Sequence, residues 1–410
     1  MKLKIKVGEL VEQISQAAIT TDPKSLDQPN SKVYLRAAKK QDTGVLYYYS
    51  TNQMARTFLK SDAEVLEIGE VLVDAASLLG GLQGRDPDLV CEITVEPEVR
   101  VLIVIGRNRF QLKYYGNVER MAKEVDALPF KAEAISTIPA QLLTDFIRRT
   151  SFCMPAASNG QQRFAMDALH LKGVDGKYFG QATDGNIISL NHGAAPAEKK
   201  PDVAGLLIAQ EALGPLGKLL AKRKDEEIEL VSNNGNQVQE LFFRMKSALF
   251  GCCLRTGKFP NISVIVEQQA PDFEITVSRE ELKSTLARVS NFVMAPTRYV
   301  QLLAKGETAL KVWACNENSD IKDEIDSAVA TGLFVSMDTW IGIDYLANVV
   351  AVMTGETITL GLSEIKSKAV IIRGDTKTDE DVLLVGSTYA ISPVKPVTPS
   401  KEAKGTTPKP

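Results

Sequence analysis

A short pattern recurs three times along this chain at a constant spacing. Each copy is an apolar or aromatic stretch followed by a small residue and a polar turn, and the copies read YYYSTNQM, YFGQATDG and KVWACNEN. The small residues, Thr51, Thr183 and Cys315, lie 132 residues apart each time. Self-similarity at a fixed period is the signature of a repeated structural unit. The spacing therefore predicts three copies of one domain.

Amphipathic segments recur in step with this pattern. They cover residues 9–18, 141–150 and 281–290, and then 73–82, 209–224 and 337–353. In 141–150 the apolar residues form one face, so Arg148 and Arg149 are expected on the polar side. Alternating stretches such as VCEITVE and EIELVS, typical of strands, follow the second helix of each unit. The order helix, strands, helix, strands predicts an α+β domain with helices on one face of antiparallel sheets.

The repeats set the expected domain boundaries. They place the three domains at residues 1–127, 128–268 and 269–390. The remaining segment, 391–410, is rich in Pro, Lys, Thr and Ser and has almost no apolar residues, so it is expected to be disordered.

Composition limits the cellular setting and the type of site. The MKLKIKVGEL start alternates like a strand, and no run of about 18 apolar residues is present. The five cysteines are scattered and only two histidines occur, which argues against a zinc site and favours reduced thiols. We therefore expect a cytoplasmic protein with no metal and no cofactor. Because the formal net charge is −3, contact with nucleic acid would need a local basic face.

Signals for catalysis are weak. No phosphate-binding GxxxxGK[ST] or GxGxxG element occurs. Asp184 precedes Gly185 between two alternating stretches, which is the pattern of a tight hairpin turn, so a structural role is favoured over catalysis. Cys252 and Cys253 have no histidine near them in sequence to activate a nucleophile. We expect a protein that is not an enzyme.

The order and spacing of these motifs resemble the bacterial sliding clamp family, the beta subunit of DNA polymerase III. FAMDALHLKG followed by QATDGNIISL is similar to a family segment ending in an ATDG turn. MKSALFGCCLRTGKFPNISVIV, GRNRFQL and ELKSTLARVSNF are similar to three further family segments. The resemblance implies three clamp-type domains and a head-to-tail homodimer that closes a ring around duplex DNA. It implies no catalytic activity, exonuclease included, and implies a polymerase subunit and a clamp loader as partners.

The resemblance and the basic helix faces together suggest where DNA would lie. The expected contacts are independent of base sequence, as for a protein that touches phosphates without reading bases. The candidates are Lys24, Arg148, Arg149, Gln161, Gln162, Phe164, Lys218, Lys222, Arg223, Lys283 and Arg288. The lining would be unevenly charged, because segment 9–18 has no basic residue and Asp74 stands where the family often has one.

A partner-peptide groove between the second and third domains is also implied by the resemblance. Such a groove needs apolar walls with a few polar groups for orientation. The matching positions are Met166, Thr183, Gly185, Asn186, Ile187, Ile188, Pro260, Val264, Ser367, Leu383, Leu384 and Val385. Two features depart from the family: Asn186-Ile187 replaces a frequent His-Arg, and LLVGSTYAI with a tail replaces a Met-Pro-Met-type strand.

The same resemblance places the dimer contact at the first domain's edge strand, GRNRFQL, against the partner's third domain. The candidates are Phe110, Leu112, Asn291 and Phe292. Two alternatives stay open. The chain could be a three-repeat scaffold that binds peptides without encircling DNA, or an enzyme with an unrecognised active site.

Overall fold

A computed structural model describes the protein over most of its length. The described residues are 1–40, 43–155, 164–195, 203–232, 239–293, 298–304, 309–316, 319–332, 337–374 and 384–394. The chain divides into two compact units. Unit 1 contains Met1–Ile147, Leu171–Tyr178 and Ala195–Gly257, and unit 2 contains Arg148–His170, Phe179–Ala194 and Lys258–Pro410. The middle repeat therefore contributes residues to both units.

Unit 1 contains a five-stranded antiparallel sheet. Its strands, in spatial order, are β5 (Glu64–Glu67), β1 (Lys2–Lys6), β7 (Val90–Glu96), β8 (Arg100–Ile105) and β9 (Asn108–Lys113). Buried and partly exposed side chains alternate along β8, as expected for a sheet with one covered face. The strand predicted from GRNRFQL is β9, and it forms one edge of this sheet.

The larger sheet of unit 1 joins strands of the first and second repeats. Its order is β10 (Ala134–Pro139), β15 (Glu227–Ser232), β16 (Glu240–Arg244), β17 (Ala248–Cys253), β4 (Ala55–Asp62), β3 (Thr43–Thr51), β2 (Val33–Lys40) and β6 (Gly69–Val73). The junction is the antiparallel pair β17 and β4, in which Cys252 lies opposite Ala55. Two repeats thus share one continuous set of backbone hydrogen bonds.

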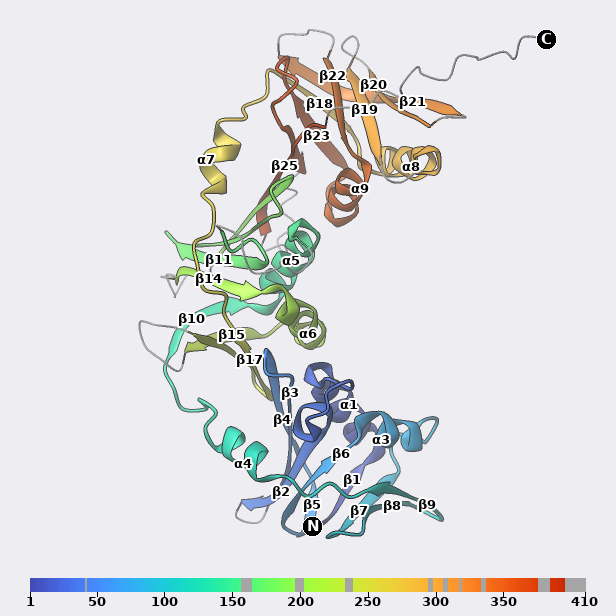
Figure 1. Ribbon diagram of the computed structural model, residues 1–410, viewed down its shortest axis with the longest axis vertical. Helices are drawn as coiled ribbons and strands as arrows, with labels where there is room; N and C mark the ends of the chain where they lie inside the picture. The colour runs from blue at the N-terminus through green and yellow to red at the C-terminus, as the bar shows by residue number, and fades with distance from the viewer. Residues whose placement is uncertain are drawn as a thin grey trace, which may run out of the picture. The chain divides into compact units, whose positions relative to one another are not determined.

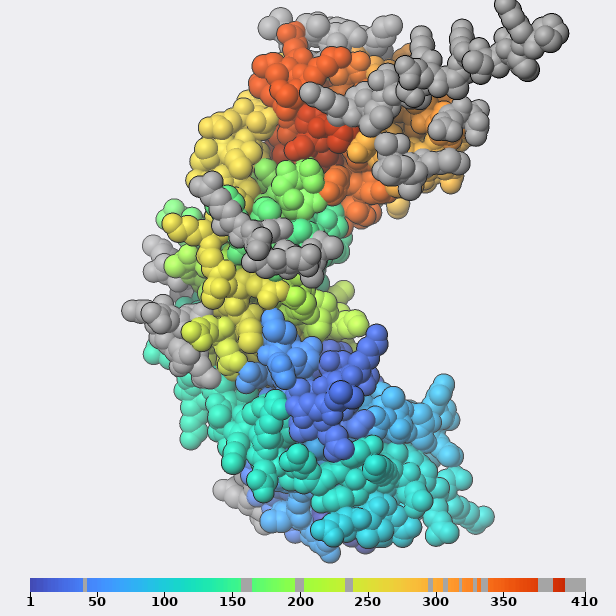
Figure 2. Space-filling model, viewed as in Figure 1, coloured from blue at the N-terminus to red at the C-terminus, as the bar shows by residue number. Residues whose placement is uncertain are grey.

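Helices cover both faces of the first-repeat strands. Successive side chains of a strand point to opposite faces, so Ser50 of β3 faces α1 (Val7–Ala17) and donates to the Ala17 carbonyl oxygen. Tyr49 points the other way, to α4 (Glu119–Asp126), and donates to Glu124 at 2.7 Å. Beneath α4, a core cluster joins Tyr34, Tyr49 and Phe58 to Leu249. Figure 1 shows α1 and α4 on opposite sides of these strands, and Figure 2 shows the blue first-repeat residues packed against the cyan-to-teal residues after them.

The remaining elements of unit 1 are short. They are α2 (Gln28–Ser31), α3 (Ala75–Leu82), β14 (Val203–Ala209) and α6 (Gln210–Leu220). Three elements are divided between the units: α5 (Ala140–Thr150), β11 (Ala168–Val174) and β12 (Lys177–Thr183).

Unit 2 is built on an antiparallel run of strands. The order is β13 (Ile187–Ala194), β25 (Leu384–Ile391), β24 (Val370–Gly374), β23 (Thr357–Leu362), β18 (Phe273–Ser278), β21 (Asp320–Gly332), β20 (Ala309–Cys315), β19 (Tyr299–Ala304) and β22 (Met337–Gly342). Its helices are α7 (Ile262–Glu267), α8 (Arg279–Val289) and α9 (Ile343–Val352), of which α8 and α9 pack together.

The threefold plan is visible in the helices. Each of α1, α5 and α8 continues directly into a 3₁₀ turn: η1 (Ala18–Thr20), η2 (Ser151–Cys153) and η3 (Ser290–Phe292). Each second helix, α3, α6 or α9, begins right after or one residue after a strand. The α+β class with three repeated units, predicted from the sequence, is confirmed.

Two predicted boundaries are wrong. Residues 337–342 form β22 rather than the start of a helix, because Thr339 and Ile341 are β-branched and buried on one face of the strand. The predicted disorder of 391–410 is also wrong for its first residues. Ile391 ends β25 with its side chain buried, and the Ser392 and Val394 amides donate to backbone carbonyls. Residues 395–410 lie outside the described part.

Candidate functional site

The turn after Thr183 is held by side-chain hydrogen bonds. The Thr183 hydroxyl donates to the Ile187 carbonyl oxygen at 2.7 Å and accepts from the Gly185 amide at 3.1 Å. The Asp184 Oδ1 accepts from the Asn186 and Ile187 amides at 2.8 and 2.9 Å. Gly185 has a φ of 92°, a conformation that favours glycine. The sequence TDG therefore closes this hairpin for local physical reasons.

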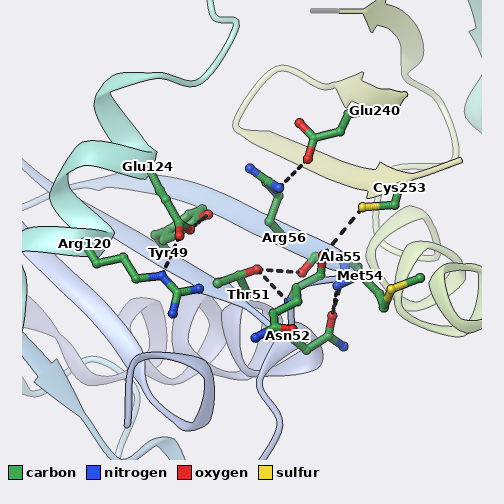
Figure 3. A network of polar contacts seen from close by, with 11 residues as sticks. Tyr49, Thr51, Asn52, Met54, Ala55, Arg56, Arg120, Glu124, Glu240 and Cys253 are labelled. Atoms are coloured by element: carbon green, nitrogen blue, oxygen red, sulfur yellow. Dashed lines mark hydrogen bonds and ion pairs between the residues drawn. The ribbon is translucent and has the colours of Figure 1, made fainter. Parts of the chain in front are cut away.

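The other two repeats use the same device. In the first, the Thr51 hydroxyl donates to the Ala55 carbonyl oxygen at 3.2 Å, and Asn52 Oδ1 accepts from the Met54 and Ala55 amides at 3.1 and 2.8 Å, as Figure 3 shows. In the third, Asn316 Oδ1 accepts from the Ser319 amide at 2.8 Å. An Asx side chain that binds the backbone two or three residues on is a common turn former. The sequence repeat is thus a repeat of turn chemistry.

The turn of the middle repeat makes two further contacts within unit 2. The Asn186 carbonyl oxygen accepts from the Ser392 amide at 2.8 Å, directly after β25 pairs with β13. The second carboxylate oxygen of Asp184 accepts from the Tyr345 hydroxyl of α9 at 2.5 Å. Burial, and then the hydrogen bond to Asp184, raise the pKa of Tyr345 to about 12. The turn is therefore linked to the end of the last strand through Asn186 and to α9 through Asp184.

A cavity of about 700 Å³ opens beside the residues that follow β25. It is lined by Trp340, Ser367, Pro393 and Val394, with Asp338 and Lys366 among its polar groups. Lys366 and Asp338 form an ion pair at 3.4 Å. The size and the mixture of apolar walls with a few polar groups suit a small ligand or a peptide side chain.

The predicted groove residues are placed as follows. Thr183 and Ile187 are buried, whereas Met166, Ile188 and Pro260 are partly buried. Gly185, Asn186, Val264 and Ser367 are exposed, and Ser367 lines the cavity. Leu383 lies outside the described residues, as do the side chains of Leu384 and Val385.

Sequence reasoning missed two parts of this region. One is Ser392-Pro393-Val394, which follows the last strand and lines the cavity; a proline between two small residues, in the place of a Met-Pro-Met-type strand, was the available signal. The other is Tyr345, whose contact with Asp184 spans 161 positions. No local pattern in the sequence indicates that contact.

Most of the predicted DNA contacts are on the surface. Lys24, Arg148, Lys218, Lys222, Lys283 and Arg288 are exposed, and Phe164 is partly buried. Three of the cations have acidic neighbours: Lys222 pairs with Glu12 at 2.9 Å, Lys283 with Glu280 at 3.7 Å and Arg288 with Asp323 at 2.6 Å. Gln161 and Gln162 lie outside the described residues.

Arg149 and Arg223 are not on the exposed face where they were expected. Arg149 is 5% exposed and donates to the hydroxyls of Ser387 and Thr354 at 3.0 and 3.4 Å. Arg223 is 7% exposed, lies just beyond α6 and donates to the Leu219 carbonyl oxygen at 2.9 Å. A cation at this place stabilises the C-terminal end of the helix by donating to one of its last carbonyl oxygens. Both guanidinium groups are therefore too buried to contact a DNA phosphate.

Asp74 is explained by its own contacts. It caps α3 by accepting from the Ser77 amide at 2.8 Å, and it forms an ion pair with Lys32 at 2.8 Å. Aspartate is a preferred helix N-cap. The residue that departs from the resembled family at this position is therefore a helix cap.

The predicted dimer residues lie at or near element edges. Phe110 is on the edge strand β9 and is partly buried against α3, where a side chain at Gly81 would collide with its ring. Leu112 is buried on the same strand. In unit 2, Asn291 is exposed and Phe292 partly buried within η3.

Among the described residues, no helix is long and apolar enough to cross a membrane. No group of three or more His, Cys, Asp or Glu side chains in the described ranges could hold a metal ion.

Comparison with known proteins gives a consistent result. No protein-family model matches the chain. The beta sliding clamp of Pseudomonas putida is 24% identical over 313 residues, which cover 75% of this chain and 79% of that protein.

Solved structures extend the match to nearly the whole chain. The DNA polymerase III subunit beta of Pseudomonas aeruginosa has a TM-score of 0.78 at 21% identity, covering 96% of this chain and 100% of that one. The DNA polymerase sliding clamp of Bacillus subtilis has a TM-score of 0.81 at 18% identity, covering 97% and 99%. The chain is therefore similar in sequence to a beta sliding clamp over 75% of its length, and it has the fold of the solved clamps.

Proposed function

We propose that this chain is a DNA polymerase processivity factor. Two copies join head to tail, so that six domains close around duplex DNA, and the proposed domains are 1–127, 128–268 and 269–390. The ring tethers the polymerase by topology, because it cannot leave DNA without opening. Its direct contacts can then be weak enough to slide.

One observation carries the partner-binding part of the proposal. The middle turn is backbone-paired to the residues that follow the last strand, and these residues line a cavity of about 700 Å³ with apolar walls. A partner peptide with one or two apolar side chains fits such walls, while Ser367 orients its backbone. The groove consists of the sequence-predicted positions together with Ser392-Pro393-Val394.

We propose that the exposed cations form the DNA-binding surface. Lys24 and Lys218 have no ion-pair partner among the residues that the structure describes, and Arg148 is exposed near the end of α5. Cations of this kind neutralise phosphates without reading bases, and their contribution falls as salt rises. This is the behaviour required of a protein that moves along DNA.

The decisive test is topological. The protein, loaded with a clamp loader onto a nicked circular DNA, should stay bound through gel filtration. It should be lost when a restriction enzyme linearises that DNA, because the ring slides off the ends. Equal retention on circular and linear DNA contradicts encirclement.

The dimer contact is tested separately. Edge strands are available for pairing, so β9 is proposed to meet the η3 region of a second copy. Replacing Phe110 with Asp should shift the protein from dimer to monomer in sedimentation velocity. Replacing the exposed Val99, in the turn between β7 and β8, with Asp is the control and should leave the dimer intact.

A second candidate function has a specific observation in its favour. Two of the expected DNA-contacting arginines are buried, and three of the exposed cations already face carboxylates. A three-repeat scaffold that binds peptides without DNA would show this pattern. It predicts normal partner-peptide binding together with no retention on circular DNA, so a partner-peptide titration beside the retention assay separates the two functions.

A further inference from the structure

Unit 1 contains a second cavity, of about 640 Å³, that has no place in the proposed function. It lies on the face of the larger sheet that α4 partly covers. On this face, Tyr34, Tyr49, Phe58 and Leu249 form one row across four strands, and this row is buried beneath α4. The next row contains Arg36, Tyr47 and Lys60, and it lines the cavity. The cavity is therefore the part of the sheet that α4 leaves uncovered.

Aromatic rings form its apolar wall. The rings of Tyr47 and Phe58 lie 5.5 Å apart, and Phe130 meets Phe58 edge-on at 4.8 Å. Phe130 is 42% exposed, whereas Phe58 is 6% exposed. A large exposed ring supported from beneath by a buried ring is a ready anchor for an apolar side chain, because the supporting contact fixes its position.

The arginines of the cavity are occupied by structural contacts. Arg36 pairs with Asp126 at 2.7 Å and with Glu70 at 3.2 Å. Arg244 pairs with Glu229 at 2.6 Å and donates to the carbonyl oxygens of residues 130 and 132 at 3.1 and 2.8 Å. These contacts hold the segment after α4 in place, so the Phe130 wall is built into the fold.

Two lysines of the cavity have no such partner. Lys60 and Lys246 are exposed, and within the described residues neither ammonium group has a hydrogen bond or an ion pair. Lys60 is on β4 and Lys246 is in the turn between β16 and β17, and the two regions are adjacent because Ala248 pairs with Leu59. Arg36 is shared between Asp126 and Glu70. The groups that the cavity offers to a carboxylate are therefore the Lys60 and Lys246 ammonium groups beside the aromatic wall.

We propose that this cavity binds a short acidic peptide segment of a partner protein. One aromatic or leucine side chain of the segment packs on Phe130, and carboxylates on either side of it meet Lys60 and Lys246. The chain's own tail does not fit, because it carries four lysines and one glutamate. Single-stranded nucleic acid fits less well, because only one ring is well exposed and a strand needs successive stacking faces.

The probe is a fluorescein-labelled heptapeptide, Gly-Asp-Glu-Trp-Glu-Asp-Gly, titrated with the full chain by anisotropy. Saturable binding that weakens with added salt is expected. The double variant Lys60→Met/Lys246→Met should bind roughly fivefold or more weakly, and Phe130→Ala should also weaken binding. The control Lys172→Met removes an exposed lysine elsewhere in unit 1 and should change nothing.

Two further measurements locate the bound peptide and test the selectivity of the cavity for acidic peptides. Hydrogen exchange should slow in residues 119–130 and 244–249 on peptide addition, with thermal melting of each variant as the check on folding. Protection at 184–188 and 392–394 instead would overturn this site while leaving the groove of the proposed function intact. No binding of the acidic peptide, or equal binding of Gly-Lys-Lys-Trp-Lys-Lys-Gly or of a labelled oligothymidylate, would also overturn it.

Discussion

The first and middle copies of the repeated turn have the same backbone pairing, but different side chains surround them. In each, a strand of the following repeat runs antiparallel to the strand after the turn: Cys252 lies opposite Ala55, and Ile391 lies opposite Ile187. The next residue then donates its amide to the turn, from Cys253 to the Met54 carbonyl and from Ser392 to the Asn186 carbonyl. The two junctions have the same register to the residue.

Side chains close the first junction. Arg56, the counterpart of Ile188, pairs with Glu240 at 2.5 Å, as Figure 3 shows. Arg255, the counterpart of Val394, pairs with Glu211 at 2.6 Å. At the first junction, these two positions therefore carry long charged side chains that are held in ion pairs.

The middle junction has shorter apolar residues at these positions. Val394 lines the cavity of about 700 Å³ beside Trp340, and Asp184 gains a contact to Tyr345 that is not found for Asn52 among the described residues. One backbone plan therefore carries ion pairs in one copy and a cavity-lining residue in the other. Sequence differences at a few positions are enough to distinguish a purely structural junction from one that offers a binding cavity.

The largest expected effect comes from removing the Asx side chain of each turn. Asp184→Ala loses two backbone hydrogen bonds and the one from Tyr345, about 3 kcal/mol, whereas Asn52→Ala loses two, about 2 kcal/mol. Thermal and urea unfolding of the full chain measure both. Equal losses would mean that the Tyr345 contact contributes nothing, and that the two turns do not differ.

A second prediction seals the middle junction in the manner of the first. Val394→Arg places a long cation where the cavity opens, so affinity for the polymerase subunit should fall about 30-fold, or about 2 kcal/mol, in surface plasmon resonance. The control Ile68→Arg adds the same charge at an exposed position of unit 1. Unchanged affinity of the Val394 variant would contradict the cavity as the partner site.

Much of this comparison between the two turns could be predicted from the sequence. Thr51 and Thr183 can be aligned by spacing alone, because turn chemistry is local: a Thr, an Asx residue and the residue with positive φ follow one another directly. The apolar faces of the helices were equally accessible from their period. The fold class followed from such local signals in order.

The errors came from non-local contacts and from one misread period. Arg149 lies three residues after Phe146 and seven after Leu142, which are both buried, so its helix position already placed it on the apolar side. Its hydroxyl partners, Ser387 and Thr354, are more than two hundred positions away and gave no local signal. The same holds for Tyr345. Contacts that depend on a distant strand or helix need the fold.

The backbone conformation of the two turns gives a third prediction, with opposite signs. Gly185 and Gln53 both have positive φ, 92° and 72°, and this costs a residue with a side chain about 1 kcal/mol. Gly185→Ala should therefore lower stability by about 1 kcal/mol, although no atom lies within 4 Å of the new methyl group. Gln53→Gly should raise it by about 0.5 kcal/mol, because relief of strain is partly offset by the entropy of an unfolded glycine.

The control for this pair is Gly80→Ala. Gly80 is helical, with open space around it, so alanine there should be neutral or stabilising. Differential scanning calorimetry of the three variants reports the signs directly. A loss at Gln53→Gly would show that the glutamine side chain contributes more than its backbone strain costs.

The smallest expected effect concerns alkaline pH, and it isolates the contact that the first junction lacks. The pKa of Tyr345 is raised to about 12 by burial and by its hydrogen bond to Asp184, above the ordinary value near 10. A raised pKa means that the contribution of the neutral hydroxyl is complete below pH 10 and is lost as pH rises through 12. Tyr345→Phe should therefore be less stable than wild type by about 1 kcal/mol or less at pH 8. That difference should shrink between pH 10 and 12, while the other buried tyrosines affect both proteins alike. A difference that stays constant up to pH 12 would mean that folding does not raise the pKa of Tyr345.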